Sequence, residues 1–122
     1  MNARVVRFAA PGSADVLKIE SVVLPEPAAG QVLVRHTAIG LNYLDVYHRS
    51  GAYPLPLPSG VGSEAAGIVE DVGPGVSLSA GDRVVYAGGA PGAYASHRIV
   101  EATRLVAIPD AVTDEVAAAV ML

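Results

Sequence analysis

The chain has 122 residues, of which 52% are hydrophobic and 16% charged, with a net charge of −4 when its three histidines are neutral. This composition excludes a disordered chain and fits one folded domain, while the scattered basic residues argue against nucleic acid or an anionic membrane as a partner. The absence of cysteine excludes disulfides, thiolate metal ligands and a cysteine nucleophile.

Most of the first 110 residues form short runs rich in β-branched and aromatic residues, separated by Gly and Pro turns, which predicts a β protein. The expected strands are Arg4–Phe8, Leu17–Leu24, Val32–Ile39, Ala65–Val72, Arg83–Ala87, Tyr94–Val100 and Arg104–Ile108. Strands that recur at a spacing of roughly ten residues are typical of a small barrel or sandwich.

A short helix is predicted over residues 42–50, between the third and fourth of these strands, because the hydrophobic period changes there. Asn42 is a suitable N-cap, Asp45 lies in the first turn, and Gly51 is a suitable stop. Residues Tyr53–Pro58 carry three prolines and therefore predict an irregular loop.

A second helix is predicted at the end of the chain, where Thr113 can cap the run that leads to Val116–Leu122. This run is apolar on every face, so we expect its packing partners to lie downstream, and expect self-association or weak order without them. It is too short to span a bilayer, and the N-terminus has no apolar signal segment, so the sequence predicts a soluble cytoplasmic protein.

Gly60, Gly62 and Ala65 match the Gly-x-Gly-x-x-Ala string of dinucleotide-binding turns. That fingerprint requires a strand before it and a helix after it. Here a proline-rich loop precedes the string and a predicted strand follows it, so we interpret these residues as turn glycines. The three histidines have no metal-ligand spacing, and we assign them to surface or packing roles.

Two longer strings carry a family resemblance. They are Gly-Leu-Asn-Tyr-Leu-Asp-Val-Tyr at residues 40–47 and Pro-Ser-Gly-Val-Gly-Ser-Glu-Ala-Ala-Gly-Ile-Val at residues 58–69. With Gly-Asp-Arg-Val at 81–84, they resemble the N-terminal GroES-like catalytic domain of the medium-chain dehydrogenase/reductase superfamily, in its zinc-independent quinone oxidoreductase (ζ-crystallin-like) branch. The resemblance covers nearly the whole chain, in order.

The resemblance implies a mainly β fold, a GroES-like partly open barrel with short helices. Residues 1–112 are then the catalytic domain, and residues 113–122 begin a helix that connects to a Rossmann nucleotide-binding domain not encoded here. The implied reaction is hydride transfer from NADPH to a quinone or a conjugated enone, by an enzyme expected to be a homodimer at full length. The fragment alone is expected to be inactive.

Zinc-dependent relatives in this superfamily have Cys at the position of Asn42 and His at the position of Ser63. Asn and Ser are poor zinc ligands beside thiolate and imidazole. We therefore expect no metal and a metal-free reaction.

The resemblance also implies a site. Asn42 and Tyr53 are expected to be catalytic, and Asn42, Tyr47 and Ser63 are expected to contact the cofactor. Alternatives from the residues themselves stay open: Asn42 can be only a helix cap, Tyr47 can be core, and Glu64 can be a buried, paired carboxylate behind the site.

Two rival functions remain. An enoyl or alkenal reductase would share the Gly-Leu-Asn-aromatic string, and a GroES-like assembly module would share the fold without the chemistry. The sequence leaves open which quinone or enone is reduced, and whether NADPH is preferred over NADH.

Overall fold

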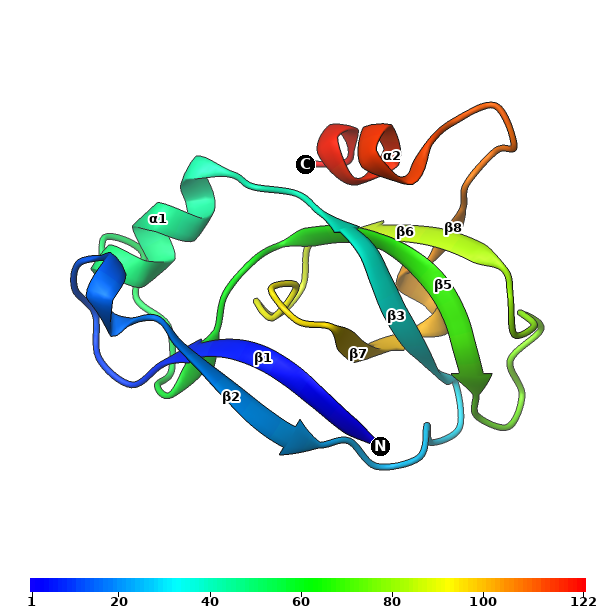
Figure 1. Cartoon of the computed structure of the whole chain (residues 1–122), viewed down its shortest axis with the longest axis horizontal. Helices are drawn as coiled ribbons and strands as arrows, with labels where there is room; N and C mark the ends of the chain where they lie inside the picture. Colours follow the sequence, from blue (N-terminus) through cyan, green and yellow to red (C-terminus); the bar gives the residue numbers. More distant parts are fainter.

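Two antiparallel sheets and two short helices make up the fold in the computed structural model, which describes all 122 residues (Figure 1). The strands are β1 (Asn2–Phe8), β2 (Lys18–Val23), β3 (Gln31–Ile39), β4 (Ser59–Gly60), β5 (Glu64–Val72), β6 (Arg83–Ala87), β7 (His97–Glu101) and β8 (Val106–Ala107). The helices are α1 (Tyr43–Ser50) and α2 (Asp114–Val120), and single 3₁₀ turns occur at Ala14–Val16 and Ala102–Arg104.

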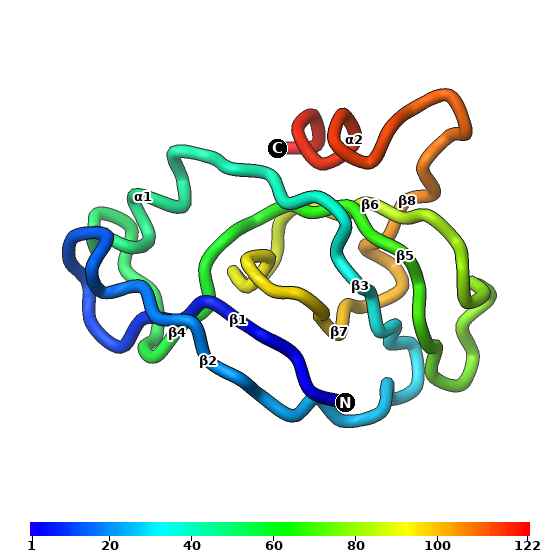
Figure 2. Tube along the Cα trace, viewed as in Figure 1, coloured from blue at the N-terminus to red at the C-terminus, as the bar shows by residue number.

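The strand order defines a barrel that is only partly closed. One sheet has the order β2-β1-β4 and the other β7-β3-β5-β6-β8. They meet where Val5 of β1 pairs with Ala95, just before β7, while β2 and β8 each pair with a single neighbour. The trace in Figure 2 follows this path from one sheet to the other. The mainly β, partly open GroES-like fold expected from the sequence is confirmed.

Period-2 alternation along the central strands produces two cores, one on each face of the larger sheet. Ala65 and Val84 point into the barrel, and their neighbours Ala66 and Val85 point to the outer face. The barrel core comprises Val32, Val34, Ala65, Val69, Val84, Tyr86, Ala93 and Val100. The outer core joins Ala66 and Val85 to residues of α2. The first part of β5 and the middle of β6 are therefore buried on both faces.

The expectation that Val116–Leu122 has no cover within the chain is wrong for one face of α2. Ala117 and Ala118 are buried against Ala66, Val85 and Ile108 of the larger sheet, and α2 lies across β3 and β5 in Figure 1. Small side chains on both surfaces allow this close approach, which hydropathy alone cannot indicate. The opposite face, which includes Val116 and Val120, is exposed.

The first turn of α2 is anchored by polar contacts as well as by packing. Thr113 Oγ1 accepts the backbone N–H of Val116 at 3.2 Å, which confirms the expected cap. Arg83 donates to the Asp114 carboxylate at 2.6 Å, and Thr37 donates to its other oxygen at 2.7 Å. The Thr37 hydrogen bond, followed by the Arg83 guanidinium, lowers the pKa of Asp114 below its ordinary value, against an opposing effect of desolvation.

Other predicted elements differ at their edges. The strand expected over Tyr94–Val100 begins only at His97, because residues 94–96 instead bond to β1 as the chain passes between the sheets. The strand expected over Arg104–Ile108 is reduced to Val106–Ala107 by the preceding 3₁₀ turn. Residues Tyr53–Pro58 form the expected irregular loop.

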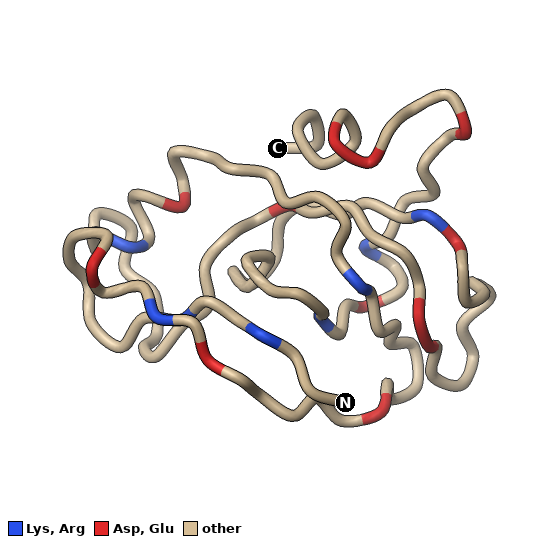
Figure 3. Tube along the Cα trace, in the orientation of Figure 1, with Lys and Arg blue, Asp and Glu red and all other residues tan.

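No helix follows the Gly-x-Gly-x-x-Ala string, because Ala65 lies in strand β5, so the string is not a dinucleotide fingerprint. The interpretation of Gly60 as a turn glycine is wrong, since it pairs with β1 in strand β4. Gly62 has φ +99° and lies against the ring of Tyr94, where a Cβ would collide. Charged side chains are spread over the whole trace without a basic cluster (Figure 3). Neither helix is long and apolar enough to cross a membrane.

Candidate functional site

Asn42 and Asp45 lie together at the amino end of α1. Asn42 has extended backbone angles and occupies the N-cap position, and Asp45 supplies the half of a capping box that reaches back to the N-cap backbone. The Asp45 carboxylate accepts the backbone N–H of Asn42 at 3.0 Å. Gly51 ends the helix with φ +86°. The predicted helix, its N-cap position and its stop are confirmed, although the only hydrogen bond of the Asn42 side chain goes to Glu64 and not to the first turn of α1.

The side-chain amide of Asn42 has a second partner that a pure cap does not require. Its Nδ2 donates to Oε2 of Glu64 at 2.6 Å, and Glu64 is only 1% exposed. The other oxygen, Oε1, accepts the backbone N–H groups of Met121 and Leu122 at 3.1 and 3.3 Å. Glu64 is therefore the buried carboxylate behind Asn42, although its partners are neutral donors instead of a cation.

Three exposed tyrosines lie close together, Tyr43 and Tyr47 on α1 and Tyr53 in the loop that follows it. The rings of Tyr47 and Tyr53 lie 5.2 Å apart between centroids, and those of Tyr43 and Tyr47 lie 6.4 Å apart. Tyr47 is 41% exposed and Tyr53 is 55% exposed, so the alternative that Tyr47 is a core residue is wrong. None of the three hydroxyls has a hydrogen-bond partner in the chain. A planar ligand can stack on such a surface.

Ser63 does not join this exposed surface. It is 3% exposed and directly precedes Glu64, on the chain segment that leads into β5. The structure therefore brings Asn42 to Glu64 and Tyr47 to Tyr53, but it leaves Ser63 beneath the surface. Contact of Ser63 with a cofactor stays a prediction.

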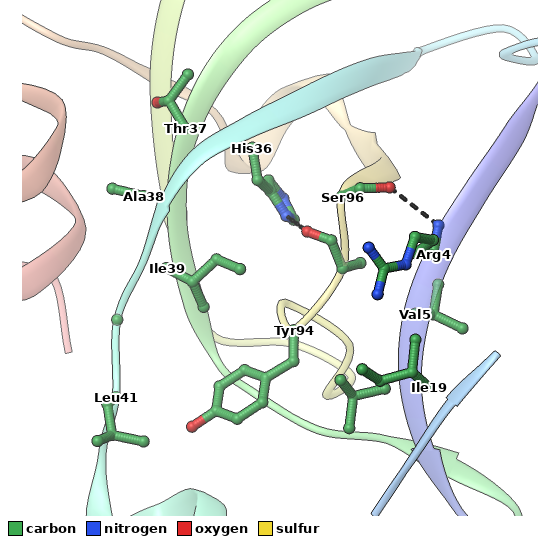
Figure 4. A pocket seen from close by; sticks show the side chains of 13 residues that line it. Arg4, Val5, Ile19, His36, Thr37, Ala38, Ile39, Leu41, Tyr94 and Ser96 are labelled. Carbon is green, nitrogen blue, oxygen red and sulfur yellow. Dashed lines mark hydrogen bonds between the residues drawn. The ribbon is translucent and has the colours of Figure 1, made fainter. Parts of the chain in front are cut away.

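A cavity of about 620 Å³ is lined by none of the four predicted site residues. It is a mostly apolar groove between the β1–β2 ribbon and the end of β3, with Ile19, Ile39 and Leu41 among its lining side chains. Figure 4 shows His36, Tyr94 and Ser96 between the two sides of the groove, with Ile39 and Leu41 on one side and Arg4 and Val5 on the other. The groove ends at Gly40 and Leu41, next in sequence to Asn42.

His36 lies in a chain of hydrogen bonds on the wall of this groove. Its Nδ1 lies 2.8 Å from the carbonyl of Ala95, and its Nε2 lies 3.0 Å from the hydroxyl of Tyr86, which in turn accepts from Arg98 at 3.3 Å. Because a carbonyl can only accept, Nδ1 carries the proton and neutral Nε2 accepts from Tyr86. Burial is the main cause that lowers the pKa of His36 to about 4. The sequence assignment of His36 to packing agrees with this arrangement.

Tyr94 and Asp45 form a further buried contact near the amino end of α1. The Tyr94 hydroxyl donates to the Asp45 carboxylate at 2.7 Å, and Asp45 is 3% exposed. Desolvation, followed by the hydrogen bond to Asp45, raises the pKa of the Tyr94 hydroxyl well above its ordinary value. Asp45 therefore does more than complement the helix dipole: it fixes α1 to the segment before β7.

Sequence reasoning missed the role of Tyr94 and the partners of His36, since each side chain meets residues far away in the sequence. The strand pattern around Tyr94 gave no signal that its hydroxyl meets Asp45. No group of three or more His, Asp or Glu side chains lies close enough together to hold a metal ion. The polar groups can hold a ligand by hydrogen bonds and stacking.

The amino-acid sequence of the chain matches a known family and is similar to curated proteins. The family model of the alcohol dehydrogenase GroES-like domain matches residues 28–110. The chain is 49% identical over 122 residues to the quinone oxidoreductase of Pseudomonas aeruginosa, with 98% of the chain and 38% of the relative covered. It is 44% identical over 104 residues to the 2-haloacrylate reductase of a Burkholderia species, with 80% of the chain and 31% of the relative covered.

The same similarity extends to three dimensions. The crystal structure of Escherichia coli quinone oxidoreductase complexed with NADPH superposes with a TM-score of 0.92 at 45% identity, over 98% of this chain and 37% of that one. The chain thus spans little more than a third of the length of the curated relatives it matches.

Proposed function

Because the chain belongs to the family of alcohol dehydrogenase GroES-like domains, we propose that it forms the substrate side of an NADPH-dependent reductase for quinones or conjugated enones. In this proposal, residues 1–112 are the catalytic domain and the segment from residue 113 leads to a nucleotide-binding domain. The homodimer and the cytoplasmic location stay predictions of the same kind.

The residues present fit a nicotinamide cofactor beside α1. Asn42 offers an amide held in one orientation, and an amide can both donate and accept hydrogen bonds. Tyr47 and Tyr53 offer ring faces and hydroxyls that the chain itself leaves without partners. This donor set suits a planar organic ligand, and we predict that Ser63 adds a contact from below.

NADPH, when bound, supplies the hydride, and a conjugated acceptor needs no metal to polarise its carbonyl. The acceptor gains negative charge on oxygen as the hydride arrives and then takes up a proton. A hydrogen bond from the Tyr53 hydroxyl can stabilise that oxygen, and Asn42 orients the cofactor and acceptor relative to each other. Asn42 and Ser63 replace the zinc ligands of other branches, which supports a metal-free reaction.

The proposal is carried by the high identity of this chain, 49%, to a quinone oxidoreductase. A buried carboxylate that fixes the Asn42 amide and an exposed pair of tyrosine rings, Tyr47 and Tyr53, support it. A chimera tests it, in which residues 1–122 replace the matching segment of the Escherichia coli quinone oxidoreductase. We expect oxidation of NADPH that depends on added 1,4-benzoquinone. A folded chimera that binds NADPH but reduces no quinone or enone would contradict the proposal.

A conjugated alkene acid is the second candidate acceptor, because the chain is also 44% identical to a 2-haloacrylate reductase. Comparing 1,4-benzoquinone with 2-chloroacrylate in the same chimera separates these acceptor classes. An assembly module of the GroES type is the rival without chemistry. It would form a ring in light scattering and leave Asn42 and Tyr53 replaceable.

A further inference from the structure

We infer that Glu64 is a positioning residue, which fixes the orientation of the Asn42 amide and ties that amide to the end of α2. The inference about orientation stands on contacts within the chain. Its importance for turnover rests on the proposed function.

Every hydrogen-bond partner of Glu64 is a donor. The Asn42 amide reaches Oε2, while the N–H groups of Met121 and Leu122 reach Oε1. This set matches an ionised carboxylate, which accepts on both oxygens and donates on neither. The amide of Asn42 must then present its nitrogen, and never its oxygen, to Glu64.

Stability alone is a weak reason for a carboxylate at this position. Buried charges are ordinarily paired with a cation, and a well-packed neutral side chain in their place is often as stable or more so. None of the ion pairs in the structure includes Glu64. A carboxylate accepts hydrogen bonds on both of its oxygens at once, which a neutral side chain at this position does not do.

These two oxygens connect the candidate site to α2. Gly40 packs closely against Glu64 and against the backbone of Ala118 on α2. A Cβ at this position would collide with both. Figure 1 shows the C-terminal end of α2 turned toward the connection between β3 and α1. A displacement of the C-terminal end of α2 would therefore move the Glu64 carboxylate and, with it, the Asn42 amide.

Glu64→Gln tests the orientation in the 122-residue chain. Glutamine replaces one acceptor with a donor, so it serves either the end of α2 or the original Asn42 amide, but not both. We expect the side-chain ¹⁵N–¹H₂ signals of Asn42 to lose the downfield shift of a carboxylate-bound amide, or the amides of Met121 and Leu122 to lose protection from exchange. The matched control is Glu115→Gln, which makes the same change of charge at an exposed position on α2. Unchanged signals in a folded Glu64→Gln variant would overturn the inference.

A double variant keeps the test decisive if Glu64→Gln does not fold. Asn42→Asp alone places two carboxylates at hydrogen-bond distance with no donor between them, and it should be strongly destabilised. Asn42→Asp combined with Glu64→Gln restores the match, because the introduced glutamine amide then donates to the introduced aspartate while the glutamine oxygen still serves α2. We expect the double variant to be more stable than Asn42→Asp. A double variant that is no more stable would contradict the assigned contact.

Kinetics in the quinone reductase chimera add the functional measurement. Glu64→Gln should lower kcat/KM by up to about tenfold, and it should cause no further loss in an Asn42→Ala background, because it acts only through Asn42. An active chimera in which Glu64→Gln behaves like Glu115→Gln would overturn the positioning role. A chimera inactive in every form would instead count against the proposed function, and the spectroscopic test would still decide the orientation.

Discussion

Two polar groups, the half-buried His36 on β3 and the buried Glu64 on β5, are treated differently by the fold. His36 on β3 is neutral, and each ring nitrogen has a complementary partner, a carbonyl on one side and a hydroxyl on the other. Glu64 on β5 is surrounded only by donors and lacks a cation. The first arrangement satisfies a polar side chain within the core, which is what stability requires. The second retains a charge whose partners include a predicted site residue and the end of a helix.

Substitutions of His36 and of Glu64 should therefore have different effects. A satisfied neutral network such as that of His36 stabilises the packing around it, so its loss should change stability. A buried charge held by neutral donors is costly to keep, so its loss should change the arrangement of the site. The predictions below separate these two kinds of effect, from the largest to the smallest.

Acid should weaken the fold through His36. The unfolded histidine binds a proton near pH 6.5, whereas the folded one does so only near pH 4. The stabilisation is therefore complete above pH 6.5 and is lost as the pH falls toward 4, by about 3 kcal/mol in total. Urea unfolding across this range, compared with His36→Gln, should show a flatter profile for the variant. His97→Gln is the matched control, and a steep profile retained in His36→Gln would exclude His36 as the cause.

Gly40→Ala should disrupt the Glu64 region by overpacking. The added Cβ overlaps Glu64 and the carbonyl of Ala118, so β3 and α2 must separate, at an expected cost of roughly 2 to 3 kcal/mol in unfolding free energy. Gly75→Ala, where φ is +81° but no atom is near, should cost only about 1 kcal/mol. Thermal unfolding of both variants checks this, and equal costs would mean that the crossing at Gly40 is not tight.

Tyr86→Phe should weaken the His36 network without affecting Asn42. The change removes the donor to His36 Nε2 and leaves that nitrogen buried without a partner, which should cost about 1 to 2 kcal/mol. The Asn42 side-chain NMR signals should not change. A shift of the Asn42 signals would show that the His36 network and the Glu64 contacts are coupled, and it would contradict their separate roles.

The sequence predicted most of the fold because its signals are local. Glycine and proline turns bounded the strands, and Asn42, Gly51 and Thr113 marked the helix ends correctly. It could not predict that α2 packs on its own sheet, because this depends on small residues such as Ala66 and Ala118 meeting from opposite ends of the chain.

The candidate site was predictable only in part, for the same reason. The family resemblance pointed to Asn42 and Tyr53, and the structure places Tyr53 on an exposed surface with Tyr47. The contacts of Glu64 with Met121 and Leu122 join residues more than fifty positions apart, and no local pattern encodes them. Only the folded chain shows that the cap residue also binds a buried carboxylate.

The central claim is that Asn42 and Tyr53 belong to a reductase site, and kcat/KM for 1,4-benzoquinone in the chimera measures this directly. Asn42→Ala and Tyr53→Phe should each lose the equivalent of one hydrogen bond, about 0.5 to 1.5 kcal/mol, or a factor of about 2 to 13. Tyr43→Phe, which removes a hydroxyl from the same exposed cluster, is the control and should leave kcat/KM unchanged. If Asn42→Ala only lowers the melting temperature while kcat/KM per folded molecule stays at the parent value, Asn42 is a helix cap and the site assignment is wrong.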